Sequence, residues 1–188
     1  MIIPIVAIGD PVLKKVCEDI DKKYPKLDEL ISSMQETMER ASGVGLAAPQ
    51  IGKAIRLFLV DSTLMLDNED GETDEIGIKE VFINAEIIEE TGEEWSFGEG
   101  CLSIPEIREN VYRKPKIVIE YFDQKWKKHT RSFDGITARV IQHEYDHIEG
   151  ILFTDHLKPL KKRMLKKKLN KISEGKINPG YKMKFPRK

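Results

Sequence analysis

The sequence predicts an α+β domain in which antiparallel or mixed β-sheets surround one central helix. Segments rich in β-branched and aromatic residues come first, and a helix that those strands must bury follows over about 136–148. A chain of 188 residues with 40% hydrophobic residues can bury one sizeable hydrophobic core, and it is too short to form two stable domains. We therefore expect residues 1–188 to form a single domain.

Composition excludes several classes of protein. Only Cys17 and Cys101 are present, so no disulfide framework is expected. No apolar run approaches the ~20 residues of a membrane-spanning helix, and the first four residues lack the charged and small-residue pattern of a signal peptide. These observations predict a cytoplasmic protein with no membrane partner.

The N-terminal part is predicted to contain an arm, a helix, a tight loop and a strand. Prolines among apolar residues predict an irregular or extended arm over 4–13. From about 25 to 40, apolar residues recur at helical spacing with polar residues opposite, which predicts an amphipathic helix packed on the body. Small residues over 42–50 form a loop whose backbone can approach another group closely. A strand is expected over 55–60.

The middle of the chain supplies an acidic insertion and further strands. Residues 64–80 are rich in Asp and Glu but lack the ligand spacing of a calcium loop, so a solvated hairpin insertion is expected. The central helix follows the turn at Asp134-Gly135 and is expected to end near Gly150. β-branched and aromatic residues predict strands over 81–88, 93–97, 116–122 and 126–133.

The C-terminal part is strongly basic. A last helix with a lysine-rich outer face is expected past Pro159, followed by a loose tail beyond Gly175. Residues 158–188 carry thirteen Lys and Arg and one acid, a net charge of +12, whereas residues 1–157 carry −13. This contrast predicts an anionic partner, with nucleic acid bound through its phosphates, although a solvated helix face is an alternative.

The chemistry centres on the stretch Gln142-His-Glu-Tyr-Asp-His147. Histidines four residues apart lie on the same face of a helix, so both can bind a single metal ion. In this His-Glu-x-x-His arrangement the glutamate, here Glu144, acts on metal-bound water. A catalytic site of this type needs three protein ligands and one open position.

The third ligand does not come from the same stretch. One class of peptidase places a further histidine where this chain has Phe153, and another uses a downstream glutamate, for which the isolated Glu174 is a poor candidate. A lone cysteine is usually a small buried residue, but Cys101 follows a predicted strand and a glycine. Cys101, His143 and His147 therefore form the expected ligand set.

Three segments resemble the motifs of the peptide deformylase family, in the same order. They are Gly43-Val-Gly-Leu-Ala-Ala-Pro-Gln50, Glu99-Gly-Cys-Leu-Ser103 and Gln142-His-Glu-Tyr-Asp-His147. The resemblance implies a hydrolase that removes the formyl group from the N-terminal formylmethionine of new polypeptides and releases formate. It also implies Fe2+ as the cofactor, with Zn2+, Ni2+ or Co2+ as substitutes, because the ligands alone do not select one metal.

The resemblance further implies roles for residues near the metal. Glu144 would carry the proton, and the Gln50 amide and the Leu102 backbone N–H would stabilise the oxyanion. Val44 and Gly45 would border the substrate and pair with its backbone.

Helix geometry and the same resemblance give three further expectations. Asp146 should point away from the metal and pair with Arg113, which would anchor the ligand helix. The basic segment 158–188 would dock on ribosomal RNA, and no DNA partner is expected. The pocket for the methionine side chain is expected around Phe97, Ile136 and Val140.

Two other functions stay open at this point. A metallopeptidase of the His-Glu-x-x-His type shares the helix, but it should use His or Glu as third ligand and does not account for the Cys101 segment. A structural metal site in an RNA-binding protein would need a fourth protein ligand. Neither His129 nor His156 is an obvious candidate for that ligand.

Overall fold

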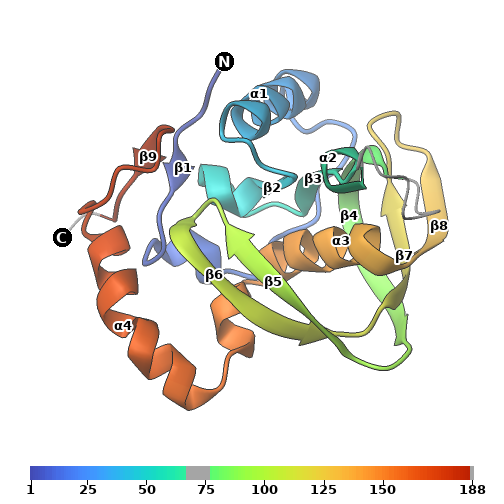
Figure 1. Ribbon diagram of the computed structural model, residues 1–188. Helices are drawn as coiled ribbons and strands as arrows, with labels where there is room; N and C mark the ends of the chain where they lie inside the picture. Colours follow the sequence, from blue (N-terminus) through green and yellow to red (C-terminus); the bar gives the residue numbers. More distant parts are fainter. Residues whose placement is uncertain (67–76, 187–188) are drawn as a thin grey trace.

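The computed structural model describes residues 1–66 and 77–186, and in it the chain forms three sheets (Figure 1). The main sheet has five antiparallel strands in the order β2-β3-β4-β7-β8. Its strands are β2 (Gly45–Ala47), β3 (Leu57–Asp61), β4 (Lys79–Thr91), β7 (Lys116–Phe122) and β8 (Lys128–Phe133). The second sheet is an antiparallel pair, β5 (Trp95–Cys101) and β6 (Ile104–Arg113). The third is a parallel pair, β1 (Ile5–Val6) and β9 (Met183–Lys184). The expected α+β arrangement of helices with antiparallel sheets is confirmed.

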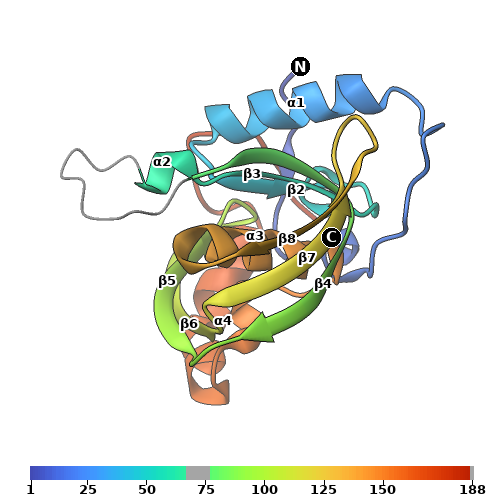
Figure 2. The same ribbon diagram turned by 90° about the vertical axis from the view of Figure 1, so that its right-hand side faces the viewer.

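Helices cover both faces of the main sheet (Figure 2). In β3, Leu57 and Leu59 pack in one hydrophobic cluster with helix α1 (Leu27–Arg40), whereas Phe58 and Val60 pack in another with helix α3 (Gly135–Ile148). Successive side chains of a strand point to opposite faces, so this strand is buried along its whole length. The other helical segments of the described residues are helix α4 (Pro159–Ser173), the single turn α2 (Thr63–Leu66) and three 3-10 turns. These turns are η1 (Pro11–Lys14), η2 (Ala48–Ile51) and η3 (Phe153–His156).

Helix α3 is the interior helix of the domain. It lies between the main sheet and the β5–β6 hairpin (Figures 1 and 2), and apolar and polar positions alike are buried on it. It ends at Ile148, and Gly150, two residues later, has a φ of +72°, the left-handed conformation typical of a residue just after a helix. The Ile151 N–H then donates to the Asp146 carbonyl at 2.9 Å. The expected central helix, with its end near Gly150, is therefore confirmed.

Strand β6 was not among the strands predicted from composition. Its second residue is Pro105, and outward positions such as Glu106 and Arg108 are polar, so neither composition nor propensity favours a strand. The pairing with β5 extends the predicted strand 93–97 as far as Cys101. The cysteine segment therefore lies at the tip of a hairpin.

The predicted acidic hairpin over 64–80 falls mostly on residues 67–76, which lie outside the described residues. At its two ends, Thr63–Leu66 form one helical turn and β4 already begins at Lys79. Among the described helices, none is both long and apolar enough to cross a membrane.

The prediction of a loose C-terminal tail is wrong for residues 176–186. Strand β9 pairs with β1, and the Ile5 and Ala7 N–H groups donate to the carbonyls of Lys182 and Lys184 at 3.0 and 2.9 Å. Composition could not reveal this pairing because the partner strand lies at the opposite end of the sequence. The tail is therefore part of the fold.

Candidate active site

Three side chains with metal-ligating atoms meet at the tip of the β5–β6 hairpin. One ligand atom from each of Cys101, His143 and His147 lies within 4.8 Å of the others. The Cys101 Sγ is 3.3 Å from the His147 Nε2. The cysteine ends β5, and the histidines are one turn apart on α3. The structure thus brings together the three residues that the sequence predicted as ligands.

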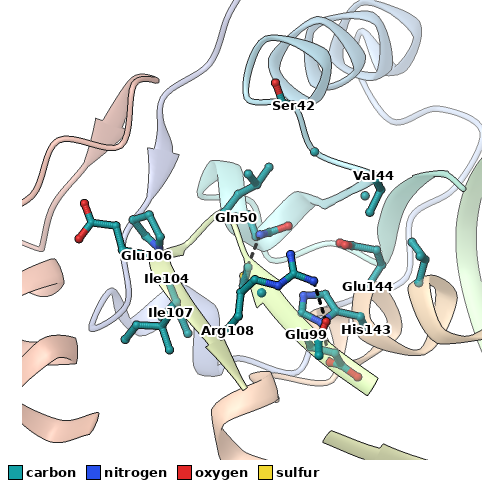
Figure 3. A pocket seen from close by; sticks show the side chains of 18 of the residues that line it. Ser42, Val44, Gln50, Glu99, Ile104, Glu106, Ile107, Arg108, His143 and Glu144 are labelled. Carbon is teal, nitrogen blue, oxygen red and sulfur yellow. Dashed lines mark hydrogen bonds and ion pairs between the residues drawn. The ribbon is translucent and has the colours of Figure 1, made fainter. Parts of the chain in front are cut away.

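Glu99 connects the strand to the helix, and the sequence analysis gave it no role. Glu99 lies on β5, two residues before Cys101. Its Oε2 is 2.9 Å from the His143 Nδ1 (Figure 3). A histidine that binds a metal usually donates its other ring N–H to a carboxylate or carbonyl. The spacing of two residues from Cys101 was the available signal for this role.

Buried arginines surround Glu99. Arg113 donates to it from Nε and Nη2 at 2.7 and 3.0 Å, and Arg139 donates from Nη1 at 3.0 Å. Burial alone would raise the pKa of Glu99, but hydrogen bonds from His143 and Arg113 outweigh it and hold the pKa below its usual range. Glu99 is therefore an anion, and it fixes the orientation of the His143 ring.

Asp146 lies behind this network. Its Oδ2 is 2.8 Å from the Arg113 Nη1, so the two residues expected to pair are in contact. The same oxygen is 2.7 Å from the His156 Nε2. Asp146, Arg113 and Glu99 thus form a continuous chain of contacts that ends on His143.

The three donor atoms fit a divalent transition metal or zinc. Burial lowers the pKa of His147 well below its ordinary value, which keeps the imidazole neutral and able to donate a lone pair. Burial also opposes charge on His143, yet hydrogen bonds to Cys101 and Glu99 raise its pKa. The surroundings of His143 therefore favour positive charge, which a bound cation would provide. One thiolate with two imidazoles is a common donor set for zinc and similar metals.

Glu144 is buried beside the ligands. Its Oε2 has no hydrogen-bond partner among the described residues, and burial raises its pKa to about 7. The side chain lies directly against Gly45, where an added Cβ would be 2.3 Å from the Glu144 Oε1. Position 45 therefore requires glycine, because a side chain there would overlap the Glu144 carboxylate.

Gln50 is held with its amide nitrogen toward the cysteine. The Ala47 N–H donates to the Gln50 Oε1 at 2.8 Å, which leaves Nε2 at 3.4 Å from the Cys101 Sγ (Figure 3). Leu102 lies next in the chain, in the two-residue loop between Cys101 and its partner Ile104. The amide of Gln50 and the loop that carries Leu102 are thus both beside the ligand set.

A cavity of about 840 Å³ opens onto this site. Four residues that the sequence predicted to contact substrate line it, namely Val44, Gly45, Phe97 and Val140. Ile136 is not among the lining residues, so its assignment to the pocket is not supported. On α3 the lining begins at Arg139, about one turn beyond Ile136. Arg108 and Tyr181 also line the cavity, which no pattern in the sequence predicted.

Comparison with known proteins gives the family. The model of the polypeptide deformylase family matches residues 2–163. The chain belongs to this family. The peptide deformylase of Christiangramia forsetii is 61% identical over 190 residues, covering 99% of this chain and 97% of that protein. The peptide deformylase of Flavobacterium psychrophilum is 57% identical over 189 residues, covering 98% of this chain and 97% of that protein.

Solved structures agree with this membership. A crystal structure of a peptide deformylase from Legionella pneumophila has a TM-score of 0.78 and 36% identity, and the match covers 94% of this chain and 98% of that one. A Plasmodium falciparum peptide deformylase has a TM-score of 0.79 and 30% identity, with 91% and 95% covered. The antiparallel sheets and the interior helix are therefore those of the deformylase fold.

In this deformylase-family chain, Asp146→Asn is expected to weaken metal retention more than the chemical step. Loss of the carboxylate charge loosens Arg113, and through it Glu99 and His143. Substitution of an outer partner of this kind costs about 10- to 100-fold in metal affinity or activity. Metal content after dialysis against a chelator, together with kcat per bound metal, separates the two effects.

Asp123→Asn is the matched control, because Asp123 also contacts a histidine, His129 at 2.8 Å, but on the β7–β8 side of the sheet. Full metal occupancy and unchanged stability of the Asp146 variant would contradict the anchoring role.

Proposed function

We propose that this chain removes the formyl group from the N-terminal formylmethionine of newly made polypeptides and releases formate and a free amino terminus. The observation that carries the proposal is the meeting of three sequence motifs at one cavity. The ligand set around Cys101, the buried Glu144 and the Gln50 amide all border that space. Membership of the deformylase family supports the same reaction.

Cys101, His143 and His147 are proposed to hold one divalent metal ion. The family resemblance favours Fe2+ in the cell, and the donor set also suits Zn2+, Ni2+ or Co2+. When bound, the ion would supply Lewis acidity, which polarises a carbonyl oxygen and lowers the pKa of water. The compact donor set and the neutral His147 ring support the proposal.

Glu144 is proposed to carry the proton. Its carboxylate would accept a proton from the attacking water and deliver it to the nitrogen of the leaving amine. A general base works best when its pKa lies near the working pH, and burial raises the pKa of Glu144 to about 7. The unpartnered Oε2 provides an oxygen that is not already committed to a protein hydrogen bond.

Gln50 and Leu102 are proposed to stabilise the oxyanion that develops on the formyl oxygen. The hydrogen bond from Ala47 fixes the Gln50 amide so that its N–H groups point toward the ligand set. The backbone N–H of Leu102 would add a second donor from the hairpin loop. A preorganised donor of this kind contributes about 3 kcal/mol to the barrier reduction.

The substrate is proposed to lie along β2 and to place its methionine side chain in the cavity. β2 is the end strand of the main sheet, so the backbone at Val44 and Gly45 can pair with an extended peptide. Phe97 and Val140 provide apolar lining for the methionine side chain. Asn178 and Arg108, elsewhere in the lining, are polar and could contact a more polar continuation of the peptide.

An assay with paired peptides tests this function against the metallopeptidase alternative. A formyl-Met tripeptide should release formate and gain one free amino terminus, with no internal cleavage. The unblocked tripeptide and casein should remain intact. Hydrolysis of the unblocked tripeptide or of casein, without formate release from the formyl-Met tripeptide, would favour a peptidase and overturn the proposal.

The basic face of α4 is proposed to dock on ribosomal RNA. Leu165 and Ile172 are buried against the body, and the opposite side of the helix carries exposed basic residues. Nothing in this helix suggests base reading, so phosphate contacts would provide the affinity and no DNA site is proposed. The exposed basic residues are Lys162, Arg163, Lys166, Lys167, Lys168 and Lys171.

Reversing three of these charges tests docking without removing the tail that packs near the site. Lys166→Glu, Lys167→Glu and Lys171→Glu together should weaken ribosome co-sedimentation about tenfold or more at moderate salt, because phosphate contacts are lost. The same reversal at the exposed Lys22, Lys23 and Lys125 is the matched control. Equal co-sedimentation of both triple variants and the wild type would contradict docking through α4.

A further inference from the structure

The C-terminal segment, residues 176–186, returns from α4 to the active-site cavity. After Ser173 the chain turns at Gly175, which has a φ of +72°, and β9 then lies beside β1 (Figure 1). Asn178, Pro179 and Tyr181 line the same cavity as Cys101 and His143. This segment lies beyond residues 2–163, the part of the chain that the family model matches.

Tyr181 contacts the loop that carries Leu102. Its hydroxyl donates to the Leu102 carbonyl at 2.8 Å, and its half-buried ring packs in the same hydrophobic cluster as the Leu102 side chain. On the other side, the Leu102 Cδ1 lies so close to Gly43 that a Cβ added there would be 2.8 Å away. Leu102 is therefore held at its side chain by Gly43 and at its carbonyl by Tyr181.

The neighbouring Ser103 is held by other parts of the chain. The Ile8 N–H donates to the Ser103 carbonyl at 2.9 Å, and Ile8 lies two residues after β1, the strand that pairs with β9. The Gln50 Nε2 lies 3.5 Å from the Ser103 Oγ. The tail, the N-terminal arm and the hairpin loop thus form one hydrogen-bonded unit. A two-residue loop with both carbonyls fixed has little freedom to rotate its peptide planes.

We propose that Tyr181 is a positioning residue for the deformylation reaction. Its hydroxyl fixes the Leu102 carbonyl, and so the orientation of the hairpin loop, and this keeps the Leu102 N–H aimed at the developing oxyanion. The inference rests on the proposed function, because it assigns a supporting residue to the donor named there. It also explains why the tail is folded against the cavity.

The test compares Tyr181→Phe with Tyr121→Phe. Tyr181→Phe keeps the ring and removes the hydroxyl that contacts Leu102. Tyr121→Phe removes a hydroxyl that donates to Glu80 on the main sheet, so it controls for the general loss of one hydrogen bond. We expect kcat on a formyl-Met peptide to fall about fivefold in Tyr181→Phe, the effect of one lost hydrogen bond. KM and metal content should match the wild type, and the control should keep its kcat.

Hydrogen exchange supplies a second readout that does not depend on turnover. Backbone amides in a peptide covering residues 100–104 should exchange faster in Tyr181→Phe than in the wild type or in Tyr121→Phe. An unchanged kcat with unchanged exchange, or equal losses in both variants, would overturn the positioning role. Absence of formate release from the wild type would instead overturn the proposed function, and the exchange result would still decide whether Tyr181 fixes the loop.

Discussion

Replacing Glu144 by glutamine is expected to lower kcat for formyl-peptide hydrolysis about 100- to 10,000-fold, the range for loss of a general acid-base residue. Glutamine keeps the shape of the side chain, which is buried against Gly45, so packing should change little. It cannot accept the proton that the carboxylate accepts. The rate of formate release, divided by the measured metal content, isolates this effect from metal loss.

Glu149→Gln provides the control for Glu144→Gln. Glu149 lies at the end of the same helix, but its carboxylate pairs with Arg56 at 2.6 Å and does not line the cavity. The control should keep the wild-type kcat. If Glu144→Gln also kept the wild-type rate with full metal content, Glu144 would not be the proton carrier, and the role assigned to the central motif would be wrong.

Cys101→Ala is the second substitution with a large expected effect. It removes the thiolate from the donor set, which leaves two imidazoles and a cavity where the sulfur was. Because a catalytic site of this type uses three protein ligands, we expect the variant to lose its metal on dialysis and to release formate only at the background rate. Metal analysis and the formate assay on the same sample measure both outcomes.

Cys17→Ala is the matched control for the cysteine. Cys17 is buried, burial raises the pKa of its thiol to about 11, and it is not part of the ligand set. That variant should keep both metal and activity, with some loss of stability from the smaller side chain. An unchanged metal content in Cys101→Ala would show that the ligand set is a different one.

The parts of the site that the sequence predicted are those with a local signature. His143 and His147 are one helical turn apart, so the pattern of a single helix places both on one side. Cys101 comes from a distant strand and was inferred because the stretch around the histidines offers no third ligand. The structure places all three together, which the pattern of strands and helices alone could not do.

Buried charge was harder to predict. Arg139 reads as an ordinary polar position on a helix, yet 2% of its surface is exposed, and it contacts Glu99 and the carbonyls of Trp95 and Val111. A buried charge is stable when it is paired and hydrogen-bonded, and these partners come from a different hairpin. Such pairing depends on tertiary structure and leaves no periodic signal in the helix itself.

Non-local strand pairing explains the remaining differences. The tail seemed loose because its own residues are polar and include Pro and Gly, but its strand β9 is completed by β1 at the other end of the chain. In the same way, β6 is stabilised by β5 and not by its own composition. The folded tail brings Tyr181 to Leu102, a contact that no local pattern indicates.

Metal titration of the anaerobically purified protein tests the central claim most directly. After removal of metal by a chelator, Fe2+ is added stepwise, and formate release from a formyl-Met tripeptide is measured at each step. A single site made by Cys101, His143 and His147 predicts a rate that starts near zero and rises to a plateau at one equivalent of metal. Full formate release from the metal-free protein, or none after one equivalent, would contradict it.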